Sequence, residues 1–127
     1  MWYSWALVRV VPRVERGEYL NVGAILFARQ ADFLRACVEL DRARLAAFAS
    51  GLDLDLVERH LRAIEAISAG RAEGGAVAAL PSSERFHWLT APRSTVIQTS
   101  PVHVGQTTDP AAALRELVAR YVRQSPA

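Results

Sequence analysis

Residues 2–12 read WYSWALVRVVP and residues 19–28 read YLNVGAILFA, and the architecture follows from their pairing. Both stretches are rich in aromatic and β-branched residues, which favour strands. The link between them, RVERGE at residues 13–18, is short and turns at Gly17, so we expect an antiparallel pair. A third apolar stretch, DFLRACVE at residues 32–39, completes a β-meander.

Polar residues and a glycine interrupt the first two predicted strands. Strict alternation places the side chain of Arg9 on the same face as Leu7, with Val8 on the other face. Asn21 and Gly23 interrupt the second strand, and a glycine within a strand often marks a bulge or the close approach of another backbone. Because both faces of the first strand are largely apolar, we expect it to lie inside the sheet or beneath helices.

Beyond residue 40 the hydrophobic pattern takes the period of a helix. Asp41 and Asp109 are suited to cap helices, and Asp53 or Asp55 is suited to start a longer one. Pro110 is suited to a first helical turn, and Ser82 or Ser83 can cap a shorter helix. The pattern predicts helices at residues 41–50, 53–69, 82–92 and 110–124, a strand at 95–99, and loops at 70–75 and 102–108. A meander followed by helices is typical of an α+β domain, here an antiparallel sheet with helices packed mainly on one face.

Size and composition indicate one globular domain spanning residues 1–127. A chain of 127 residues is too short for two well-buried cores, and 51% hydrophobic residues argue against disorder. The lone cysteine, Cys37, cannot form an internal disulfide and suits a reducing compartment. The apolar stretch at residues 5–11 is short and broken by Arg9, so we expect no signal peptide, no membrane span and a cytoplasmic location.

All 15 basic residues are arginine, the residue that binds carboxylate and phosphate groups in a bidentate manner. The net charge is only +2 and no basic residues are consecutive, so nucleic-acid binding through bulk charge is not expected. The three histidines lack metal-ligand spacing, and phosphate-loop, dinucleotide-binding and nucleophile-elbow motifs are missing. The sequence therefore predicts no metal, no cofactor and no catalytic residue, and it favours a non-enzymatic protein.

Three polar residues stand inside predicted strands that are otherwise apolar: Arg9, Asn21 and Gln98. A buried polar group without a partner costs about 1–3 kcal/mol, so each must be satisfied. In one interpretation they pair with one another or with nearby glutamates in a structural network. In the other they line a ligand pocket together with Arg85 and Arg93.

The turn RVERGE poses the same choice. Its alternating charges can pair locally in solvent, or Arg13 and Arg16 can face an anion at the end of the sheet.

The segment SSERFHWLTAPRSTVIQTSPVHVG, residues 82–105, carries the remaining candidate binding residues. Arg85 and Trp88 are three apart and share a helix face. Arg93 and Ser94 lie at a helix-to-strand junction, where they can hold an anion or simply form a turn. His103 lies beyond the following strand, in the kind of segment that often carries sites on rigid scaffolds.

The turn and this later segment carry matching charges, so we expect them to meet in space. Specifically, we expect at least two of four arginines to share one cleft or network, with Asn21 or Gln98 in its wall. The four are Arg9, Arg16, Arg85 and Arg93. Either carboxylates or an anionic ligand should satisfy them.

The segments RVVPRVERGEYLNVGAILF, ELDRARLAAF, SSERFHWLTAPRSTVIQTSPVHVG and DPAAALRELV together resemble the uncharacterised bacterial family catalogued as domain of unknown function 3037. The resemblance covers nearly the whole chain. It implies a small bacterial cytoplasmic protein without an established activity. Because members resemble products encoded beside HipA-like kinase genes, it also implies a HipA-like kinase as partner.

These observations favour a non-enzymatic accessory or interaction protein that works with a HipA-like kinase. The alternative is a domain that binds a small anion or a nucleotide phosphate, with or without catalysis, at an arginine-lined site. A weaker alternative is RNA binding through arginine and exposed tryptophan. An apolar patch would favour the first, a pocket converging on Arg9, Arg85 and Arg93 the second, and a continuous basic stripe the third.

Overall fold

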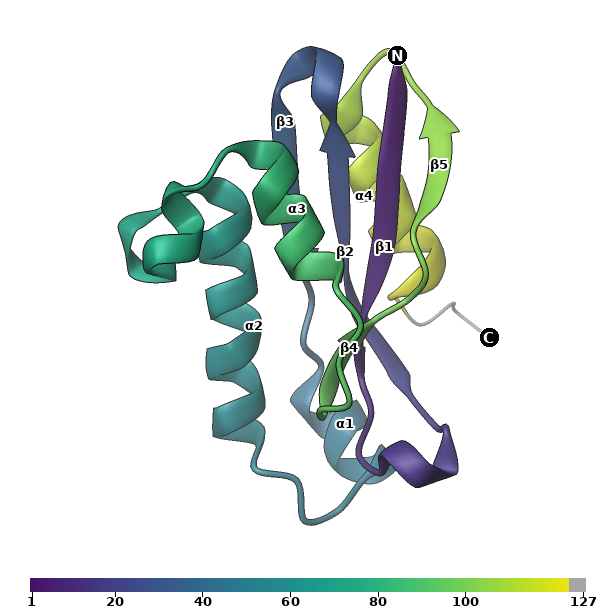
Figure 1. Ribbon diagram of the computed structural model, residues 1–127. Coiled ribbons are helices and arrows are strands. Elements are labelled where there is room, and N and C mark those ends of the chain that lie inside the picture. The colour runs from purple at the N-terminus through teal and green to yellow at the C-terminus, as the bar shows by residue number, and fades with distance from the viewer. Residues whose placement is uncertain (124–127) are drawn as a thin grey trace.

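The computed structural model describes residues 1–123, which form an antiparallel sheet with helices on both of its faces (Figure 1). The strands are β1 (Trp2–Val10), β2 (Leu20–Ala28), β3 (Phe33–Val38), β4 (Ile97–Thr99) and β5 (His103–Gln106). The helices are α1 (Arg42–Phe48), α2 (Leu54–Ala69), α3 (Ser82–Thr90) and α4 (Pro110–Tyr121). The predicted α+β class is confirmed.

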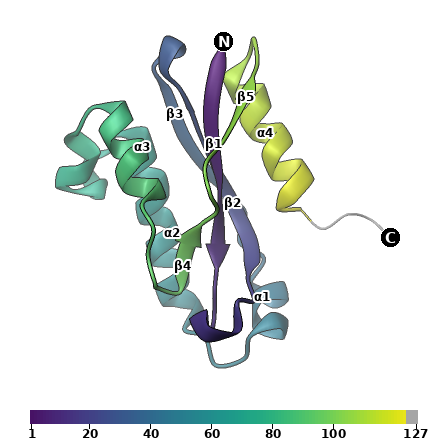
Figure 2. The same ribbon diagram turned by 45° about the vertical axis from the view of Figure 1, so that its right-hand side comes forward.

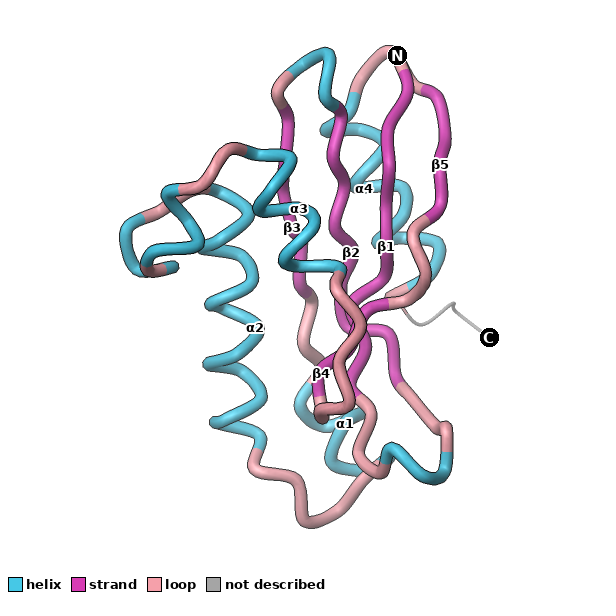
Figure 3. Tube along the Cα trace, in the orientation of Figure 1, coloured by secondary structure: helices cyan, strands magenta, loops and turns pink. Residues whose placement is uncertain are grey.

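The strand β1 is the centre of the sheet. It pairs antiparallel with β2, which pairs with β3, so the predicted meander is confirmed. The other side of β1 is shared between two short strands, with β4 beside Val8–Val10 and β5 beside Trp2–Trp5 (Figure 3). Ser100, between β4 and β5, bonds to Leu7 of β1. Its hydroxyl accepts from Leu7 N at 2.8 Å, and its own N–H donates to Leu7 O at 2.9 Å.

A β-bulge lies in the middle of the β1–β2 ladder. Val8 pairs with Gly23 and Arg9 with Asn21, which leaves Val22 without an opposite residue. At Gly23 an added Cβ would lie 2.8 Å from the carbonyl oxygen of Cys37 on β3, closer than real Cβ atoms come. The glycine therefore marks both a bulge and a close backbone approach, as predicted.

The first three helices cover one face of the sheet. Val8 and Ile25 of the sheet pack in one cluster with Leu45, Leu61 and Phe86, which come from α1, α2 and α3 in turn. Leu45 and Leu61 are fully buried, as the helical pattern of apolar residues requires.

The last helix, α4, covers the opposite face (Figure 2). Leu7 and Leu26 of the sheet pack there against Leu117 and Val118 of α4. Leu7 and Val8 belong to different clusters because successive side chains of a strand point to opposite faces. The predicted packing of this helix on the sheet is thus confirmed, and it gives the sheet a second covered face.

Side-chain caps begin three of the helices. Carboxylate oxygens of Asp41, Asp53 and Asp109 accept from backbone N–H groups of Arg44 at 3.0 Å, Leu56 at 3.1 Å and Ala112 at 3.2 Å. These caps were expected. The cap predicted for α3 is not formed, because Pro81 occupies the N-cap position and the Ser82 hydroxyl donates instead to Asp32 at 2.8 Å.

Two segments expected as loops carry regular structure. Residues 103–106 form β5, because they pair with the start of β1. An added Cβ at Gly105 would lie 2.6 Å from the ring of Tyr3, its partner across the strands, so the glycine makes room for that ring. Residues 72–74, within the expected flexible loop, form a 3₁₀ turn.

Candidate functional site

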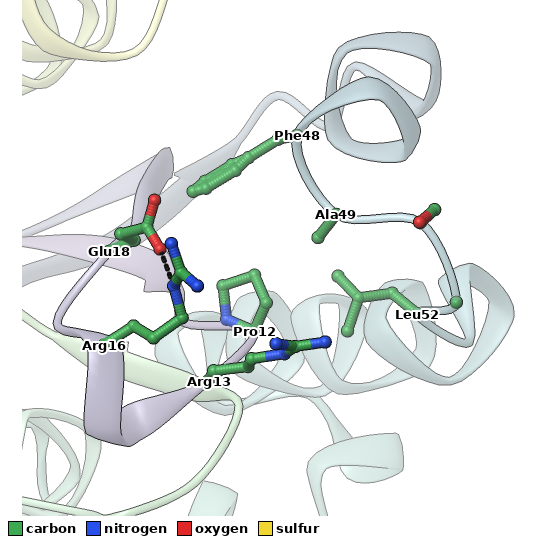
Figure 4. Close-up of a pocket in the computed structure, with 9 residues that line it drawn as sticks. Pro12, Arg13, Arg16, Glu18, Phe48, Ala49 and Leu52 are labelled. Atoms are coloured by element: carbon green, nitrogen blue, oxygen red, sulfur yellow. Dashed lines mark hydrogen bonds and ion pairs between the residues drawn. The ribbon is translucent and has the colours of Figure 1, made fainter.

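The turn at residues 13–18 and the loop after α1 enclose an open groove of about 570 Å³ (Figure 4). The turn contains a short 3₁₀ helix, Val14–Arg16, that ends at Gly17 with a positive φ of 69°. Figure 4 shows the side chain of Arg13 extending toward Leu52. The lining residues are Pro12, Arg13, Arg16, Glu18 and residues 48–52.

The two arginines of this groove differ in their partners. Arg16 pairs with the carboxylate of Glu18, and both side chains are well exposed. Such a pair is weak and screened by salt. Arg13 forms no ion pair with any residue from 1 to 123. The groove therefore presents an unpaired positive charge and can accept a small anion.

The structure brings Arg9, Asn21 and Gln98 into one row across β1, β2 and β4. Arg9 lies between the other two, directly opposite Asn21 on one side and Gln98 on the other. The amide of Gln98 donates to Thr95 O at 2.9 Å, and the guanidinium of Arg9 stacks on the ring of Tyr19 at 3.9 Å. Within residues 1–123 the three side chains form no hydrogen bonds with one another.

Arg85 is hydrogen-bonded to three backbone carbonyl oxygens. Its Nη1 donates to Ser68 O at 2.7 Å and to Ile67 O at 3.0 Å, and its Nε donates to Leu80 O at 2.9 Å. Ser68 O and Ile67 O belong to the last turn of α2, where carbonyls lack the usual partner four residues on, and Ile67 O also accepts from the capping Gly70 N–H at 3.1 Å. Arg85 therefore satisfies the end of α2 and connects it to the segment before α3.

Arg93 does the same for α3. Its guanidinium donates to Trp88 O at 2.7 Å and to Leu89 O at 3.2 Å, and it stacks over the Trp88 ring at 4.5 Å. Trp88 thus pairs with Arg93, whereas the sequence placed it with Arg85. Ser94 is exposed. Arg93, which was expected to hold an anion there, instead donates to the backbone carbonyls of α3.

The four arginines expected to meet therefore take separate places. Arg16 lies in the groove, Arg9 in the strand row, Arg85 at the end of α2 and Arg93 at the end of α3. Within residues 1–123 they share no hydrogen-bond acceptor, and Arg85 and Arg93 are satisfied by backbone carbonyls, which neither sequence-based interpretation foresaw.

His103 belongs to an aromatic stack on the α4 face. Its ring lies 4.7 Å from that of Trp5, its cross-strand partner, and Trp5 stacks in turn on Tyr121 at 5.5 Å. The sequence singled out His103 for its position after a strand, and it did not connect His103 with Trp5 or Tyr121. The stack ties β5 and β1 to the end of α4.

The outer edge of β5 is bare. Within residues 1–123 its strand partner is β1 alone, and residues 102–108 contain no Asp, Glu, Arg or Lys. Val104 is 69% exposed and Trp2, on the adjacent part of β1, is 66% exposed. This edge is the second candidate site, and sequence reasoning missed it because it treated the segment as a loop.

Two side chains near the end of β3 have shifted pKa values. Hydrogen bonds from Arg123 lower the pKa of Glu39, while burial raises the pKa of the Cys37 thiol. A raised pKa keeps that thiol protonated and unreactive. Within residues 1–123, acidic, histidine and cysteine side chains form no cluster suited to a metal ion.

The fold and its sites define a small α+β protein with one bare sheet edge and an arginine-lined groove. None of the helices in the described part of the chain has the length and apolar content needed to cross a membrane. The chain belongs to the family described as protein of unknown function (DUF3037), which it matches over residues 5–122. No curated protein and no solved structure matches it.

Proposed function

We propose that this protein is a cytoplasmic, non-enzymatic accessory protein that binds a partner protein at the outer edge of β5. The observation that carries the proposal is this uncharged edge, together with the exposed side chains of Val104 and Trp2. An edge strand presents unpaired N–H and C=O groups, and proteins that do not use such an edge usually protect it with charge or proline. Addition of a partner strand is a common mode of recognition at such edges.

Val104 and Trp2 lie on one face of the sheet. Val104 is opposite Ser4 and Gln106 is opposite Trp2, so alternation places both apolar side chains on the face that carries Val8. The helices α1 to α3 pack on that face, yet they leave Trp2 and Val104 exposed. An added strand would supply backbone hydrogen bonds along the edge, and its side chains would cover this apolar pair.

The partner we propose is a HipA-like kinase. Its support is the resemblance set out from the sequence, which implies such a kinase as partner of the family that the chain matches over residues 5–122. In this proposal the small protein contributes a binding surface and the kinase contributes the chemistry.

Co-purification tests this function. The tagged full chain is expressed with the HipA-like kinase encoded nearest to its gene, and the retained kinase is quantified. Val104→Lys should abolish retention, because it places a charge on the edge where a strand would pair. The matched control is Leu56→Lys, which adds the same charge on α2, at an apolar side chain that is 43% exposed. Equal retention by both variants, or none by the unaltered protein, contradicts the proposal.

A second function, binding of a small anion or nucleotide phosphate, is supported by the unpaired Arg13 in the groove. Calorimetric titration with inorganic pyrophosphate tests it. Arg13→Gln should remove the heat of binding, whereas Arg59→Gln, which removes an exposed charge on α2, should leave it unchanged. Binding that survives in Arg13→Gln contradicts the groove as the site.

A further inference from the structure

Arg9 differs from the other arginines in its surroundings. Within residues 1–123 each of the others either donates to a carbonyl or carboxylate oxygen or is exposed to solvent. Arg9 is half-buried and donates no hydrogen bond to these residues, and its Nε is buried without a partner. A buried N–H without an acceptor costs free energy, and among the guanidinium nitrogens of Arg9 this cost falls on Nε.

Stacking holds the guanidinium in place without using its hydrogen-bond donors. Its carbon lies 3.9 Å from the centre of the Tyr19 ring, so the ring contacts the face of the group. The five N–H donors lie in the plane of the guanidinium and point outward from its edge. Tyr19 therefore fixes the orientation of Arg9 and leaves those donors available.

The neighbours of Arg9 in the strand row do not supply the missing acceptor. Asn21 donates through Nδ2 to Tyr121 O at 3.2 Å, and its Oδ1 is buried without a partner. Asn21 and Arg9 are directly opposite one another but are not hydrogen-bonded, so joining Oδ1 to the Nε–H would need an adjustment of a side chain. That adjustment still leaves the terminal nitrogens of Arg9, and no carboxylate within residues 1–123 pairs with them.

We propose that Arg9, oriented by Tyr19, binds an oxyanion, namely the phosphate or carboxylate group of a small ligand. Two oxygens of such a group match the fork of a guanidinium, and the partial burial of Arg9 strengthens the interaction relative to water. The site is distinct from the groove at Arg13, which involves the loop after α1. It stands independently of the partner interaction at β5.

The Nε–H resonances of the arginine side chains test this site by NMR on the full chain. The protein is titrated separately with sodium phosphate and sodium acetate, with sodium chloride holding the ionic strength constant. We expect a saturable shift of the Arg9 resonance, and no saturable shift at Arg115, which is exposed on α4. Saturation with phosphate alone assigns a phosphate group as the ligand chemistry, and saturation with acetate alone assigns a carboxylate.

Two variants separate binding from folding. Arg9→Lys keeps the charge but loses the planar fork, and Tyr19→Leu keeps Arg9 but removes the stack; each should weaken the anion affinity severalfold. Arg115→Gln should leave it unchanged. Linear responses of Arg9 and Arg115 alike to both anions would overturn the proposal, since they would reflect general screening. Binding to Arg9→Lys with unaltered affinity would overturn it as well.

Discussion

The two edges of the sheet are treated in opposite ways. At β3, side chains of α2 satisfy outward backbone groups, since Ala36 N–H donates to the Ser68 hydroxyl at 2.9 Å and Val38 N–H donates to Glu65 at 3.4 Å. At β5, no helix side chain among residues 1–123 takes this role, and Val104 is exposed. One edge is closed by side chains of α2, and the other has no such cover among residues 1–123.

Under the proposed function, this difference separates stability from recognition. β3 lies in the cluster that contains α1, α2 and α3, whereas β5 contacts mainly one end of β1. Changes at the closed edge should therefore alter folding, while changes at the open edge should alter binding and leave folding intact.

The largest expected effect is at Leu34 of β3, which is only 1% exposed. Leu34→Ala should lower the free energy of unfolding by about 2–5 kcal/mol, because it removes buried methyl groups and leaves a cavity. Val104→Ala at the open edge should change it by no more than about 0.5 kcal/mol. Urea denaturation of both variants measures the contrast. Equal losses would show that the two edges contribute alike to the core.

Ser68→Ala should remove the hydroxyl that closes the β3 edge. The Ala36 N–H would then lack its acceptor in a site where Ser68 is almost fully buried, at a cost of about 1–3 kcal/mol. Hydrogen exchange at the Ala36 amide should accelerate. Ser50→Ala, at an exposed position, is the control. An unchanged exchange rate at Ala36 would mean that the hydroxyl does not protect this edge.

Arg85→Ala should destabilise the helix that covers β3. It removes the donors to Ser68 O and Ile67 O at the end of α2, for a loss of about 1.5 kcal/mol, the lower end for hydrogen bonds to charged groups because these are only partly buried. Thermal unfolding measures this loss. Because the proposed partner surface at β5 is remote from α2, the proposed kinase retention should persist at temperatures where the variant is folded. Loss of kinase retention by a folded Arg85→Ala variant would contradict the separate roles of the two edges.

The smallest effect is expected at the pH-sensitive contact beyond β3. Hydrogen bonds from Arg123 at 2.6 and 2.9 Å lower the pKa of Glu39 from its ordinary value of 4.5. A lowered pKa in the folded state stabilises the protein above pH 4.5, and the contribution is lost as the pH falls through the shifted value. Arg123→Gln should slightly flatten the pH dependence of unfolding below pH 4.5. A profile identical to that of the unaltered protein would contradict this.

The regular parts of the fold could be predicted because their signals are local. Stretches rich in aromatic and β-branched residues predicted the meander, and Asp41, Asp53 and Asp109 marked helix starts that the structure confirms. β5 could not be predicted in the same way. Its four residues form a strand because they meet β1, and pairing across a hundred residues leaves no local pattern.

The candidate sites were predictable only in part. The polar residues Arg9, Asn21 and Gln98 were recognised from their places in apolar strands, and the structure sets them side by side. The partners of Arg85 and Arg93 were not predictable, because backbone carbonyls at helix ends occur in every sequence. Charge matching predicted glutamates as the partners of these two arginines, whereas the structure places backbone carbonyls within reach of them.

The arrangement around β1 has a consequence for the order of folding. One side of β1 pairs with β2 nearby in the chain, but its other side is completed by residues about a hundred positions later: Ser100 bonds to Leu7 and Thr107 to the Met1 nitrogen. On a ribosome the hairpins β1–β2–β3 can form while β4 and β5 are still unmade. Until those residues emerge, the nascent chain carries an exposed apolar strand edge, which is the state in which chaperones are most often needed and aggregation is fastest.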